Sequence, residues 1–137
     1  MNAAAASRIA ARALPWLLLA YCATSLLHFV HNAEYLADYP NLPAWISRAS
    51  VYGVWGGIFV LGLGGYLLYR RGHAVAGLTL LAAYTSLGFD GLLHYGRAPM
   101  SAHTVAMNLT IWSEVAAAAV ALAAVLWLGI HCARATR

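Results

Sequence analysis

The sequence has no lysine and little charge of either sign, with eight arginines and four acidic residues among 137. Charged residues make up 9% and hydrophobic residues 63% of the chain. Because roughly a quarter of the residues of a soluble domain are charged, an ordinary soluble domain is excluded. The net charge of +4 comes without a basic stretch interleaved with aromatics, so no nucleic-acid partner is expected.

Motifs of the common enzymes are also missing. The sequence has no phosphate loop, no nucleotide-binding motif and no Ser/His/Asp or Cys/His arrangement. Its two cysteines, Cys22 and Cys132, stand alone without CxxC spacing. The first falls in the middle of an apolar stretch and the second at the end of another, so no disulfide is expected.

Four long apolar stretches occupy most of the chain. A helix needs about 20 residues to cross a bilayer core, and each stretch reaches that length. The predicted spans are residues 14–35, 44–70, 74–95 and 102–130. Asn41 with Pro43, and Ser101, are the expected start signals of the second and fourth helices. The prediction is one all-α domain, residues 1–137, folded as a four-helix transmembrane bundle.

The arginines predict the orientation of this bundle. Six of them lie at the two termini and between the second and third spans, whereas Arg48 and Arg97 flank the opposite side. By the positive-inside rule, both termini are cytoplasmic and the loops near residues 36–44 and 97–101 are exterior. The alanine-rich, lysine-free composition points to a bacterium, so the expected location is the bacterial inner membrane.

Two polar stripes interrupt the apolar stretches. Asp90 and His94 are spaced i, i+4, which places them on one face of a helix. Another stripe follows on the next helix at spacings i, i+4, i+7 and i+11, and consists of His103, Met107, Thr110 and Glu114. Ionisable residues in membrane helices are costly, so they indicate function.

The ends of three spans should meet at the exterior side of an antiparallel bundle. This brings together His28 and His31 from the first span, Asp90 and His94 from the third, and His103 from the fourth. Imidazole with carboxylate is the ligand set of copper, iron and zinc, so these five residues are the predicted metal ligands. Glu114 lies deeper and is the candidate catalytic residue, as a proton acceptor. Whether Glu34 and Asn108 also belong to this site is left open.

Asp90, His94 and His103 resemble a metal-binding segment in the C subunit of membrane-bound methane and ammonia monooxygenases. The likeness covers these three residues, and the gap between the two histidines is shorter here. It implies only that Asp and His on adjacent membrane helices can hold copper or zinc.

The preferred hypothesis is a small membrane metalloprotein with redox or hydroxylase-type chemistry, with enzyme activity left open. One alternative is an electron-transfer subunit holding a b-type haem between His94 and a histidine of the first span. Another is an accessory or metal-handling subunit of a larger membrane complex, whose polar residues only bond one another. Gly53, Gly57 and Gly64 favour close helix packing, within the bundle first and in a homodimer second.

Overall fold

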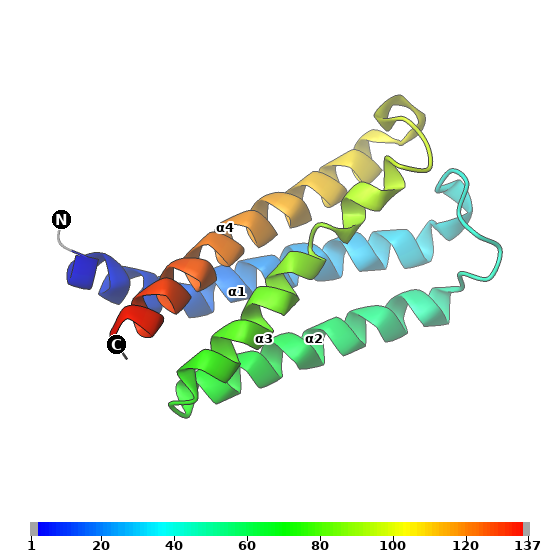
Figure 1. Ribbon diagram of the computed structural model, residues 1–137. Helices are drawn as coiled ribbons and strands as arrows, with labels where there is room; N and C mark the ends of the chain where they lie inside the picture. The colour runs from blue at the N-terminus through cyan, green and yellow to red at the C-terminus, as the bar shows by residue number, and fades with distance from the viewer. Residues whose placement is uncertain (1–2, 136–137) are drawn as a thin grey trace.

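The computed structural model describes residues 3–135, and this part of the chain is helical throughout its regular structure (Figure 1). Its long helices are α1 (Ala3–Glu34), α2 (Arg48–Arg70), α3 (Ala74–Leu87) and α4 (Val105–Ala135). Short 3-10 helices fill the connections, namely η1 (Leu36–Asp38), η2 (Asp90–His94) and η3 (Met100–Ala102). Within the described residues, four segments are long and apolar enough to cross a membrane, and they are Arg8–Glu34, Arg48–Arg70, Ala74–His94 and Val105–Arg134. The predicted bundle of four such helices is confirmed at this level.

The helices run alternately up and down, so that the start of α1, the end of α4 and the α2–α3 turn lie at one end (Figure 1). The other end carries the connections of residues 35–47 and 95–104, and is called the loop end below. Helix α4 packs along α1 and α3, and α3 packs along α2. Contact between α1 and α2 is sparser, which leaves a seam between them.

Small residues let the helices approach closely, as expected for bundles in lipid. A Cβ atom on Gly88 would lie 2.6 Å from Cε2 of Tyr21, and one on Gly62 would lie 2.8 Å from the ring of Tyr84. The predicted packing glycines of α2 are different ones. Added Cβ atoms on the set Gly53, Gly57 and Gly64 would meet nothing within 4 Å among the described residues. The prediction that this set packs within the bundle is therefore wrong, because it lies on the outer face of α2.

The third span does not continue as one α-helix to residue 95. Helix α3 ends at Leu87, and the chain passes through a turn at Gly88 and Phe89 into η2. Gly88 is packed against Tyr21 of α1 and against α4, a fit that only glycine allows. The expected α-helical stacking of Asp90 over His94 is therefore wrong, since a 3-10 helix has three residues per turn.

Two helices also begin later than predicted. Ser47 caps α2, with its side chain accepting from the backbone N–H of Ser50 in a capping box. Asn41, the predicted start signal of this helix, lies in the preceding loop in a left-handed conformation, with φ +57°. The hydroxyl of Thr104 accepts from the N–H of Met107 at 3.2 Å. Thr104 is therefore the N-cap of α4, the role that was expected of Ser101.

Candidate functional site

Four ionisable side chains are buried together in the loop half of the bundle. The exposed fractions are 2% for His28, 8% for His94, 7% for His103 and 0% for Glu114. His28 belongs to α1, His94 to η2 and Glu114 to α4, and His103 lies two residues before the start of α4. Burial of so many polar groups in one place is costly unless each has a partner, so their partners decide what the cluster can do.

His28 is paired with Glu114 across the α1–α4 interface. Its Nδ1 atom faces Oε2 of Glu114 in a short, buried contact. A carboxylate oxygen accepts the hydrogen bond, so Nδ1 of His28 carries a proton and Nε2 is the second ring nitrogen. That Nε2 atom is buried and has no hydrogen-bond partner among the described residues. Glu114 therefore lies beside one histidine of the cluster and fixes its ring.

His103 is held in the same way by the backbone. Its Nδ1 atom donates to the carbonyl oxygen of Pro99 at 3.1 Å. A carbonyl oxygen can only accept, so Nδ1 carries a proton and Nε2 is the nitrogen left for another partner. This Nε2 is also buried, with no partner within residues 3–135.

His94 is held by an amide. The Nδ2 atom of Asn32 donates to Nε2 of His94 at 3.2 Å, and Nδ1 of His94 is buried and unpartnered in the described structure. The Oδ1 atom of Asn32 is likewise buried and unpartnered there. Turning this amide by half a turn exchanges donor and acceptor, so that His94 would donate through Nε2 and leave Nδ1 bare.

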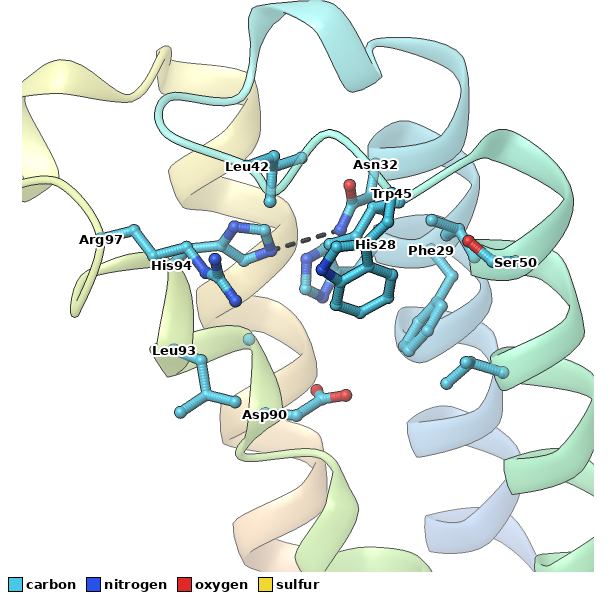
Figure 2. Close-up of a pocket in the computed structure, with 14 residues that line it drawn as sticks. His28, Phe29, Asn32, Leu42, Trp45, Ser50, Asp90, Leu93, His94 and Arg97 are labelled. Carbon is cyan, nitrogen blue, oxygen red and sulfur yellow. Dashed lines mark hydrogen bonds between the residues drawn. The ribbon is translucent and has the colours of Figure 1, made fainter.

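A cavity of about 210 Å³ opens beside these side chains (Figure 2). His28, Asn32, Asp90 and His94 line it, with the Oδ1 atom of Asp90 unpartnered among described residues. Figure 2 shows Asp90 below the two imidazoles, on the side opposite Asn32. Although Asp90 and His94 no longer share an α-helix, both still face the cavity.

The imidazoles stand next to one another without forming a ligand shell. The ring centres of His28 and His94 are 5.6 Å apart, and those of His94 and His103 are 6.2 Å apart. Two imidazoles that bind one metal at about 2.0–2.1 Å have ring centres roughly 5–6 Å apart. However, in the part of the chain that is described, no three His, Cys, Asp or Glu side chains are grouped so that they could hold a metal ion. The rings have the right separation, and their nitrogens do not point to a common centre.

Three other candidates lie around the cluster. His31 turns to the loop, where its Nδ1 atom is 2.9 Å from the hydroxyl of Tyr39. Glu34 pairs with Arg48 at the surface. Asn108 bonds the carbonyl oxygens of Met100 and His103 and so supports the loop.

The sequence interpretation overlooked Asn32 and Tyr39. Asn32 is four residues after His28, so helical spacing places the two on one face of α1, a signal that could have identified it. The ring centre of Tyr39 is 4.8 Å from that of His94, a contact made by the loop fold alone. Burial raises the pKa of Tyr39 to about 12, so its phenol stays protonated and can donate to His31.

Comparisons with protein-family models, with curated proteins and with solved structures find no match to this chain. Its class is therefore defined by its own fold and site, as a four-helix bundle of membrane-spanning length with a buried histidine and carboxylate cluster.

Proposed function

We propose that the chain is a small membrane metalloprotein with a transition-metal site in the loop half of the bundle. The ligands would be His28, His94 and His103, with Asp90 as the carboxylate. Copper, iron or zinc suits such a mixture of imidazole and carboxylate. His31 is not included, because it bonds Tyr39 in the loop.

One observation carries this proposal. Three neighbouring imidazoles are each fixed through one ring nitrogen, and each leaves the other buried without a partner among the described residues. Metal-binding histidines are held in this way, with the second nitrogen donating to a carboxylate or a carbonyl. His28 and His103 donate so, and His94 does so once the amide of Asn32 is turned to present its oxygen. A histidine that served packing alone would need neither the orientation nor the unpartnered nitrogen.

The protein side chains have distinct roles in this proposal. Glu114 keeps the proton of His28 on Nδ1, and the carbonyl of Pro99 does the same for His103. Asn32 controls which nitrogen of His94 is bare. A bound transition metal would supply Lewis-acid or redox chemistry at the cavity. Small rotations of the rings would have to bring the three nitrogens to one centre.

We also propose a bacterial inner-membrane location with both termini in the cytoplasm. The start of α1 and the end of α4 lie at the same end of the bundle, as this orientation requires (Figure 1). The arginine distribution supports it, with six of eight arginines at the ends and turn of that side. The candidate site would then be on the exterior side.

A second candidate is a non-catalytic accessory subunit with a structural polar cluster. The lack of a ready group of metal ligands in residues 3–135 favours it. The pair of His28 and Glu114 would then serve only to join α1 and α4. The haem alternative has less support, since the cavity of about 210 Å³ is small beside the roughly 300–1,000 Å³ of cofactor and ligand pockets.

Metal analysis and a visible spectrum of the detergent-purified protein test the proposal. We expect one bound metal per chain without a Soret band, and we expect His94→Ala and His103→Ala to abolish binding. His131→Ala is the matched control, because His131 is at the other end of α4 and bonds the backbone of Trp127. A Soret band would select haem.

Asn32→Leu and Glu114→Gln refine the test. Each removes or alters the partner of a ligand, so metal affinity should fall about 10–100-fold without a loss of all binding. Equal metal content in wild type, His94→Ala and His103→Ala would reject the metal site and leave the accessory function.

A further inference from the structure

Helices α1 and α2 together line two cavities that follow one another along the bundle, and η2 and the loop before α2 complete the first one. The first is the cavity beside His94, of about 210 Å³. The second, of about 200 Å³, is lined by residues of the same two helices, including Leu19, Phe59 and Leu63, and by Tyr84 of α3. From Phe29 in the first lining to Cys22 in the second is seven residues of α1, or about 10 Å.

The first cavity reaches the outer surface of the bundle between α2 and η2. Val54 and Leu93 line it, belong to segments long enough to span the membrane, and are 55% and 66% exposed. A molecule dissolved in the bilayer could therefore reach the polar side chains sideways. Its apolar part would extend along the seam toward the second cavity.

The polar wall of the first cavity selects a neutral head group. Asp90 and Arg97 both line it, so their formal charges cancel. Apart from the imidazole nitrogens, two groups of this wall keep a polar atom without a partner among the described residues. Oδ1 of Asp90 accepts, and the amide of Asn32, which bonds His94 through one end, leaves its other end free. A hydroxyl group matches this wall, because it donates one hydrogen bond and accepts others.

We propose that the α1–α2 seam binds a lipid-soluble alcohol or phenol, with the hydroxyl among Asn32, Asp90 and His94 and the hydrocarbon tail in the second cavity. This inference deepens the proposed function, since it names the substrate class of the same site. The orientation of the molecule, with its head toward the loop end, is that of an amphiphile in the outer leaflet. Binding itself needs only the cavity walls.

Photo-crosslinking tests this proposal directly. The probe is a long-chain primary alcohol with a diazirine in the middle of its chain, added at low mole fraction to the full-length protein in phosphatidylcholine nanodiscs. We expect label on the seam, in the peptides that contain Cys22 and Phe59. Competition by the unlabelled alcohol should be about 5–10-fold stronger than by its methyl ether, because the ether cannot donate a hydrogen bond.

Two tryptophan variants provide a matched comparison. Val54→Trp places a large ring at the opening of the first cavity and should remove most of the seam label. Val60→Trp makes the same change on α2, at a residue that is 65% exposed and lines neither seam cavity, and should leave the label unchanged. Label spread over all lipid-facing helices, or equal competition by alcohol, ether and plain alkane, would overturn the proposal in favour of ordinary lipid contact. A dimeric mass of the nanodisc-embedded protein together with no seam label would overturn it in favour of a second copy.

The same labelling is done with chelator-treated and metal-loaded protein. If the protein takes up no metal on loading but still shows seam label, this inference is supported and the proposed metal site is rejected. Bound metal without seam label would reject this inference alone.

Discussion

The buried pair of His28 and Glu114 should be the strongest polar link between α1 and α4. Within residues 3–135, the side chain of each residue hydrogen-bonds the other, and each is at most 2% exposed. Removing either residue leaves a buried polar group without its partner, which costs about 1–3 kcal/mol. We therefore expect Glu114→Ala and His28→Ala each to destabilise the bundle measurably in the absence of metal.

The coupling energy between these two residues can be bounded. Polar contacts between membrane helices average about 0.6 kcal/mol and reach about 1.7 kcal/mol, because the unfolded chain in a micelle also finds partners. Breaking a buried ion pair in a soluble protein costs about 3–5 kcal/mol. Since both helices stay in the micelle on unfolding, the membrane values apply. Complete burial then places the expected coupling near the upper limit, at about 1–2 kcal/mol.

A double-mutant cycle measures this coupling, from unfolding of chelator-treated protein in mixed detergent micelles. The matched control is the cycle for Arg48 and Glu34, whose side chains are 66% and 34% exposed. An exposed pair should couple by less than about 1 kcal/mol. Additive effects at His28 and Glu114, or a coupling no larger than that of the control pair, would refute the view that this contact joins the helices.

Gly88→Ala should destabilise the bundle by about 1–3 kcal/mol in the same unfolding assay, since its Cβ has no room. Gly57→Ala should be neutral or stabilising by up to about 1 kcal/mol, and a large loss there would instead indicate a homodimer through α2. In a cysteine-free background, Ser101→Cys should react with an impermeant thiol reagent in intact cells and Arg71→Cys should not; the reverse pattern would invert the topology. Asn41→Ala should cost about 1–2 kcal/mol more than Asn41→Gly because of the left-handed backbone, and equal melting temperatures would contradict this.

Local sequence sufficed for the existence of four long helices and for the buried face of the fourth. Four apolar stretches predicted four long helices, since only a helix satisfies its own backbone in lipid. The stripe of α4 was also predictable, and Met107, Thr110 and Glu114 are all buried. Spacing of 3.6 residues per turn places them on one face whatever the neighbouring helices do.

The break after α3 depended on information that the local pattern lacks. The apolar stretch continues through residue 95, so the sequence predicted one helix. Gly88 is needed because Tyr21 and Ala118, distant in sequence, pack against it. Its position then determines where η2 starts and how Asp90 and His94 face the cavity.

The pairings within the candidate site were decided by the tertiary structure alone. His28 and Glu114 are separated by 86 residues, and His94 and Asn32 by 62. Helical spacing determines the face on which each residue lies, whereas the depth and rotation of one helix against another follow from packing of all their side chains. The sequence therefore indicated most of the histidines and carboxylates of the cluster, but neither Asn32 nor Tyr39. Only the packed bundle determined that Glu114 holds His28, that Asn32 holds His94, and that His31 turns away to Tyr39.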